Sequence, residues 1–114
     1  MTPLDADGRT DLLPGTLDLL ILQTLQLQPL HGLGVADRLR QLTGGTFSVQ
    51  PGSLFPALHR LEQDGSIEGT WTSTDRNHRV RSYRLTAAGR RQLAVEKRNW
   101  ARIVSAMNQV LEPR

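Results

Sequence analysis

The chain has 114 residues, no cysteine and a formal net charge of +3 at neutral pH. This length predicts one domain and leaves no room for an enzyme with a separate regulatory module. The lack of cysteine excludes a disulfide framework and a thiolate metal site. The longest apolar stretch, residues 17–27, is too short and too polar to span a bilayer, and the acidic N-terminus lacks the basic region of a secretory signal. We therefore expect a soluble cytoplasmic protein with no membrane contact.

Charge is distributed unevenly along the chain. Residues 1–75 carry a net charge of −5, whereas residues 76–114 carry +8. Six arginines and no carboxylate lie between Arg76 and Val95. A block of one sign attracts polyanions, whereas a surface that only solubilises a protein usually mixes its signs. Charge alone leaves nucleic acid, acidic lipid, an acidic protein and a simple solubilising face open.

The polar residues 1–13 predict a flexible N-terminal arm. A helix follows, with Thr16 as its cap and the Gln-Pro pair at 28–29 as its end. One face of this helix is apolar at helical spacing, with Leu17, Leu20, Ile21 and Leu25. Leu19 and Leu22 form a second apolar patch roughly opposite. A helix that is apolar on two sides needs two surfaces to pack against, so we expect Leu19 and Leu22 to face a partner.

Two short helices come next. After a turn at 31–32, the second helix is predicted over 34–43, where a pair of glycines ends it. The third is predicted over 51–64, because Pro51 suits a first helical turn and Gly65 follows the end. Pro56 fits only if this helix starts late, near Ser53, or bends at that point. The sequence leaves these alternatives open.

Beyond Gly65 the period of the pattern changes from helical to alternating. Strands are predicted over 67–72 and 80–85, joined by a polar loop. The fold class is therefore mainly α with a small β-hairpin, a winged helix-turn-helix over residues 14–85. In helix-turn-helix proteins the recognition helix, here the third helix, enters the major groove of DNA.

A long C-terminal helix is predicted from the Thr86 cap to about Leu111, followed by the end of the chain at 114. Its length of about 39 Å exceeds what so small a domain can cover. An apolar stripe runs along this helix. Leu93, Trp100 and Met107 are spaced by seven residues, and Ile103 and Val110 occupy intermediate positions. Such a stripe is typical of the seam between paired helices, so residues 86–114 are predicted to be a dimerisation helix. The alternative is a helix that folds back onto its own core.

The outer face of the third helix has small residues at its N-terminal end and lacks acidic residues until Glu62. We expect this face to approach a major groove, with Arg60 on guanine or phosphate and the other polar groups on base edges or water. Its residues are Gly52, Ser53, Pro56, His59, Arg60 and Gln63. The hairpin is expected to add sequence-independent attraction to phosphates or the minor groove. Its candidate residues are Arg76, His78, Arg79 and Arg81, placed at or near the tip.

Two motifs resemble the PadR family of regulators. The segment from Gly52 to Gly65, GSLFPALHRLEQDG, is similar to the family pattern that ends in ALxRLExxG, and SYRLTAAGRR at 82–91 resembles its YYRLTxxGR signature. Trp71 and the His-Gly pair at 31–32 match further family positions. Phe55, a candidate DNA-facing residue, and Ser82 stand where the family usually has Tyr, so Phe55 lacks the hydroxyl that would bind a phosphate. The resemblance implies a homodimeric regulator, usually a repressor, that binds a pseudo-palindromic operator. No cofactor is expected.

The resemblance also implies a ligand site. In compact multidrug-responsive members of the family, flat apolar compounds lie between tryptophans of the two long helices, and Trp100 stands at the corresponding place. The alternative is that Trp100 simply fills the dimer seam. Catalysis and metal binding have no support, because the three histidines fall in separate segments without ligand-spaced neighbours. A winged helix that binds an acidic protein remains the second functional hypothesis.

Overall fold

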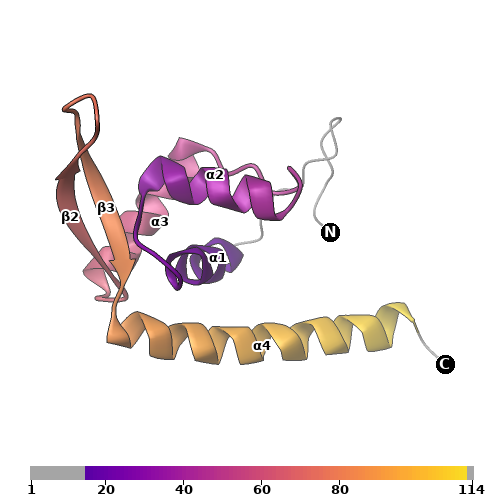
Figure 1. The fold of residues 1–114 in the computed structure, drawn as a ribbon. Coiled ribbons are helices and arrows are strands. Elements are labelled where there is room, and N and C mark those ends of the chain that lie inside the picture. The colour runs from indigo at the N-terminus through magenta and orange to yellow at the C-terminus, as the bar shows by residue number, and fades with distance from the viewer. Residues whose placement is uncertain (1–14, 113–114) are drawn as a thin grey trace.

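The computed structural model describes residues 15–112, and the predicted N-terminal arm at 1–13 lies outside them. These residues form four helices and a three-stranded antiparallel sheet (Figure 1). The helices are α1 (Thr16–Leu25), α2 (Gly32–Leu42), α3 (Pro51–Gln63) and α4 (Ala87–Leu111). The strands are β1 (Leu30–His31), β2 (Ile67–Ser73) and β3 (Arg79–Leu85), in the order β1-β3-β2. The predicted fold class, a winged helix with a long C-terminal helix, is confirmed.

Helix α1 lies at the centre of the helical body, between α4 and the α2–α3 pair (Figure 1). The core contains thirteen buried apolar side chains, Ile21, Leu22, Leu25, Val35, Leu39, Leu54, Ala57, Leu58, Leu61, Ile67, Tyr83, Leu85 and Leu93. Leu22 has no exposed surface, so its predicted role in a dimer interface is wrong. Leu19 is half-buried beside this core. The helix begins at Thr16 itself, because Gly15 takes the capping position with a left-handed backbone (φ 88°).

Helices α2 and α3 pack closely through a glycine. Helix α2 begins at Gly32, two residues earlier than predicted, and the ring of Phe55 lies over this glycine. A Cβ atom at position 32 would come within 2.7 Å of that ring. Helix α3 begins at Pro51 and accommodates Pro56 in its interior, which settles the question of its start. Pro56 lies on the exposed side of the helix and removes only the bond to the carbonyl of residue 52.

The sheet contains a strand that the pattern did not predict. Instead of a simple turn, Leu30 and His31 pair with Tyr83 and Ser82 of β3. Two residues are too few for an alternating pattern, and the pairing joins segments about fifty residues apart along the chain. Strands β2 and β3 pair along their whole length, from Ile67 opposite Leu85 to 73 opposite 79. The hairpin of β2 and β3, here called the wing, projects away from the helices (Figure 1).

Helix α4 starts as predicted, because the Gly89 amide donates a hydrogen bond of 3.0 Å to the Thr86 hydroxyl. Its first turns pack on the body, where Leu93 is buried in the core. The prediction that Leu93 faces a dimer partner is therefore wrong, because the side chain is enclosed by its own subunit. The rest of the helix runs past α1, away from the wing (Figure 1).

Candidate nucleic-acid interface and dimer surface

The predicted reading face of α3 is exposed as one surface. It lies opposite the buried residues Leu54, Ala57, Leu58 and Leu61 of the same helix. All seven candidate residues of the helix are exposed, namely Gly52, Ser53, Phe55, Pro56, His59, Arg60 and Gln63. Within this set Phe55 is 44% exposed, because one side of its ring covers Gly32. The helix thus presents a mostly polar outer face with small residues at its start.

Arg60 on this face has a partner in another helix. Its guanidinium lies 2.6 Å from the carboxylate of Asp18 in the first turn of α1. The arginine side chain is 55% exposed, so donor groups remain accessible on its outer side. Sequence reasoning did not assign a role to Asp18, because the two residues are 42 positions apart and only the packing of α1 on α3 joins them.

The tip of the wing carries unpaired positive charge. Arg76 and His78 lie in the connecting turn and Arg79 begins β3, and all three are exposed. Asn77 adopts a left-handed conformation (φ 60°), which closes the turn. Among residues 15–112, Arg76 and Arg79 have no ion-pair partner. The Arg79 guanidinium stacks 4.9 Å from the centre of the Trp71 ring.

Arg81 is not at the tip, which corrects the predicted position. It lies in the middle of β3 directly opposite Trp71. Its guanidinium forms an ion pair with Glu62, near the end of α3, and this hydrogen bond raises the pKa of Arg81. Burial raises the pKa of the neighbouring Tyr83 hydroxyl, and the Glu62 carboxylate adds to the effect. Arg81 is therefore half-buried and its charge is locally neutralised.

The second half of α4 exposes a continuous apolar stripe. Its side chains are between 39% and 76% exposed, and they are Trp100, Ile103, Val104, Met107, Val110 and Leu111. In one subunit nothing among the described residues covers this stripe. Of the predicted dimer residues, Trp100, Ile103, Met107 and Val110 are thus available to a partner, and half-buried Leu19 lies beside them.

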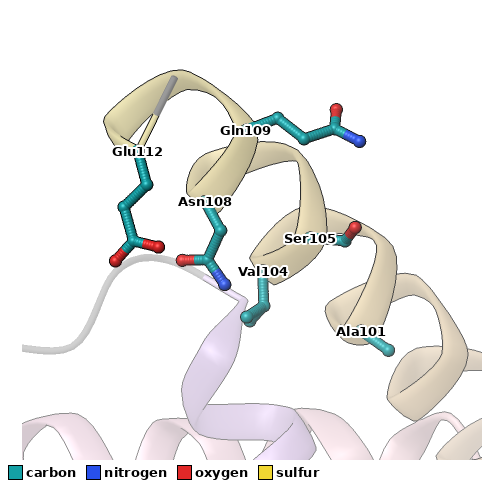
Figure 2. Close-up of a pocket in the computed structure, with 6 residues that line it drawn as sticks. All are labelled: Ala101, Val104, Ser105, Asn108, Gln109 and Glu112. Atoms are coloured by element: carbon teal, nitrogen blue, oxygen red, sulfur yellow. The ribbon is translucent and has the colours of Figure 1, made fainter. Parts of the chain in front are cut away.

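Several cavities adjoin α4, and two of them border the apolar stripe. One of about 310 Å³ lies between the start of α1 and α4, where Leu19, Trp100 and Ile103 supply apolar walls and Glu96 a carboxylate. Gln92 donates a hydrogen bond to one Glu96 oxygen, and the other oxygen is buried without a partner. The second, of about 610 Å³, follows the last turns of the helix, where Val104 and Asn108 project on one side and Gln109 on another (Figure 2).

Residues 15–112 contain no cluster of three or more His, Cys, Asp or Glu side chains arranged to hold a metal ion. None of the helices in this range is long and apolar enough to cross a membrane. The three histidines lie apart, at the sheet edge, on α3 and in the wing turn.

Comparisons with known proteins agree on one family. The family model "Transcriptional regulator PadR-like family" matches residues 21–95. The transcriptional regulator Rv3488 of Mycobacterium tuberculosis is 41% identical over 59 residues, which cover 52% of this chain and 54% of that protein. A solved PadR family regulator from Clostridium difficile R20291 is 28% identical with a TM-score of 0.74, covering 85% of this chain and 99% of that one.

A solved transcriptional regulator from Clostridium thermocellum has a TM-score of 0.77 at 23% identity, covering 83% of this chain and 92% of that one, which is a likeness of fold. The family match spans more than half of the chain and includes α2, α3, the whole wing and the start of α4. It confirms the resemblance that the two sequence motifs carry, and places the protein among transcriptional regulators rather than enzymes. The chain belongs to the PadR-like family of transcriptional regulators.

Proposed function

We propose that this regulator is a homodimeric repressor that binds a pseudo-palindromic operator in duplex DNA. The observation that supports this most is the exposed outer face of α3 beside a wing whose tip arginines, Arg76 and Arg79, have no carboxylate partner within the described range. An exposed helix face of this kind suits a major groove, and a wing with free arginines suits the flanking backbone or minor groove. Because such a protein acts at the chromosome, the proposal includes a cytoplasmic location.

The dimer in this proposal is formed by the exposed apolar stripe of α4, with Leu19 beside it. Residues 86–114 are then the dimerisation helix and residues 14–85 the DNA-binding domain. Exposed apolar side chains in a row are removed from water when a second copy covers them, which favours association. A closed two-fold arrangement would present two α3 helices to half-sites about 34–36 Å apart.

Footprinting over the DNA upstream of its own gene tests the proposal. Protection of an inverted repeat that overlaps a promoter, with half-sites one helical turn apart, supports a dimeric repressor. Protection without overlap of a promoter would argue against repression. If the protein protects no sequence and binds no duplex at any salt concentration, the DNA-binding proposal fails and an acidic protein partner becomes the better hypothesis.

Arg79→Ala is expected to weaken binding to operator and random duplex alike. Arg79 is exposed at the wing and has no acidic partner among the described residues, so its removal eliminates sequence-independent attraction. The slope of log affinity against log salt should fall by about one for each phosphate that the side chain neutralises. His59→Ala on α3 is the comparison, because removing a side chain that binds a base edge should reduce the operator preference by about 1–3 kcal/mol. Titrations of both duplexes at several salt concentrations separate these effects. An unchanged salt slope for Arg79→Ala would contradict the assignment.

We also propose that a small planar apolar compound binds beside Trp100 and releases the protein from DNA. The cavity of about 310 Å³ and the 42% exposed Trp100 support this. A planar dye such as acridine should quench tryptophan fluorescence, and Trp100→Ala should abolish the quenching. Trp71→Ala should leave it intact, because Trp71 lies on the wing. Absence of quenching across a panel of planar dyes would mean that Trp100 only fills the dimer seam.

A further inference from the structure

The wing is linked to the end of α3 by one side chain. Arg81 projects from the middle of β3 and forms its ion pair with Glu62 in the last turn of α3. Both side chains are about one-third exposed or less, so water screens this pair less than the exposed pair of Arg84 and Glu68. The chain itself joins α3 to the wing through the short segment 64–66, after which the buried Ile67 begins β2 at the base of the wing. The ion pair therefore joins the wing to α3 at a second point, farther out along the strands.

The path of the Arg81 side chain depends on Gly69. This glycine lies in β2, and the Arg81 guanidinium passes directly over it. A Cβ atom at position 69 would come within 2.7 Å of Arg81 Nε and 3.0 Å of Cζ. Because the group in the way is the far end of a flexible side chain, an added methyl group would displace the guanidinium rather than the backbone. Gly69 thus leaves the space that Arg81 needs to reach Glu62.

Two of the three arginines of β3, Arg79 and Arg81, share Trp71 as a neighbour. Its ring is 5.4 Å from the Arg81 guanidinium and 4.9 Å from that of Arg79, and all three side chains lie on one face of the wing. Arg79 has the same aromatic neighbour as Arg81 and no carboxylate partner among the described residues. The two positions differ in the bond to Glu62 and in exposure, since Arg79 is exposed and Arg81 is half-buried. Arg79 therefore serves as the comparison on the same face of the wing.

We propose that Arg81 and Glu62 form a strut that fixes the angle between the wing and α3, and that Arg81 is a positioning residue rather than a phosphate ligand. Glu62 holds the guanidinium against the protein, with Gly69 below it and Trp71 beside it. The strut sets where the wing tip lies when α3 is in a major groove, so it controls operator affinity through geometry. This inference rests on the proposed DNA binding, and it assigns to Arg81 a role opposite to that expected of a basic wing residue.

The test compares four variants of the full-length protein, Arg81→Ala, Glu62→Gln, Gly69→Ala and Arg79→Ala. The probes are a duplex that the wild-type protein enriches from a randomised pool and a random duplex of equal length. The three strut variants should each lower affinity for the enriched duplex by about fivefold, the size of coupling within a partly screened pair. They should leave the affinity for the random duplex, and the salt slope of that binding, close to those of wild type, because the tip arginines are unchanged. Arg79→Ala should lower the salt slope instead.

Gly69→Ala and Glu62→Gln make the test decisive, because both retain the positive charge of Arg81. If Arg81 were a phosphate ligand, freeing it by Glu62→Gln would strengthen binding to both duplexes, and Arg81→Ala would reduce the salt slope as Arg79→Ala does. Either result overturns the strut. The Arg81→Ala/Glu62→Gln double variant should bind no more weakly than either single variant, and additive losses would also contradict the proposal. If the wild-type protein enriches no duplex from the pool and does not bind the random duplex, the failure lies in the proposed DNA binding and not in the strut.

The strut also has a readout that is independent of DNA. In a Trp100→Phe background, Trp71 is the remaining tryptophan of the chain. Arg81→Ala, Glu62→Gln and Gly69→Ala should each shift its emission, since each removes or displaces the guanidinium beside the ring. Emission that changes only in Arg81→Ala would mean that neither Glu62 nor Gly69 determines where the guanidinium lies.

Discussion

Gly89→Ala should destabilise the protein by about 3 kcal/mol, the upper range for overpacking a well-filled site. Gly89 is buried in the first turn of α4, where the helix crosses the end of α3 and the start of β2. A Cβ atom at this position would lie 2.0 Å from the carbonyl oxygen of Ser66 and 2.7 Å from Leu85 Cδ1. The first of these neighbours is a backbone atom, so no side-chain rotation relieves the clash.

The surrounding hydrogen bonds increase this cost. The Ser66 carbonyl accepts a bond from the Thr86 amide. The Thr86 hydroxyl lies 2.7 Å from the Gly65 carbonyl and 3.0 Å from that of Ser66, and it also accepts the Gly89 amide as the cap of α4. Any movement of α4 that relieves the clash must lengthen these bonds, while the helix also carries Leu93 into the core. The overpacking and the weakening of the cap therefore act together.

Urea unfolding at a fixed protein concentration measures the effect of Gly89→Ala. Gly52→Ala is the matched control, because Gly52 is also a helical glycine but a Cβ atom there would have open space, with nothing within 4 Å. This control should be neutral or more stable by up to about 1 kcal/mol, as expected from helix propensity. A Gly89→Ala protein as stable as wild type would show that α4 is not fixed tightly to Ser66.

Met107→Asp should convert the proposed dimer to monomers, with a rise in the dissociation constant of at least about a hundredfold for a buried, unpaired charge. Met107 is 53% exposed in one subunit and lies in the middle of the apolar stripe on α4. In the proposed dimer a carboxylate there would lose its hydration without gaining a cation. Operator affinity should fall as well, since each monomer would hold only one half-site.

Sedimentation over a range of protein concentrations measures this change. Gln109→Asp introduces the same group two residues away, about 200° around the helix at about 100° per residue, and should remain dimeric. If Met107→Asp also remains dimeric, the stripe is not the interface and the assembly we propose is wrong. Circular dichroism of both variants confirms that the subunit itself has folded.

Much of the architecture could be predicted because it is encoded by local signals. Thr86 caps α4 through the backbone three residues later, and the alternation at 67–72 marks β2, so each element is visible within one short window. Strand β1 was missed because its two residues are defined only by pairing with β3. Leu22 and Leu93 were misassigned because helical periodicity shows that a face is apolar. It does not show whether that face is covered by the same subunit or by a partner.

The candidate interface was predicted only in part for the same reason. The outer face of α3 follows from spacing alone, so its exposed residues could be named in advance. The partners of its neighbouring charges could not, because Asp18 meets Arg60 and Glu62 meets Arg81 only after α1, α3 and β3 have packed. An arginine counted as a free charge in a sequence can thus be neutralised in the fold.

The continuity of α4 has a mechanical consequence for a dimer built on it. The helix is unbroken from Ala87 to Leu111, with no proline and no glycine after Gly89 to act as a hinge. Leu93 anchors one end in the core, and Met107 lies about 21 Å farther along at 1.5 Å per residue. If α4 tilted by about 10° over this length, one end would move by about 4 Å relative to the other. A small change in how two α4 helices pack would therefore rotate each subunit as a rigid body. The distance between the two α3 helices would change without deformation of either subunit.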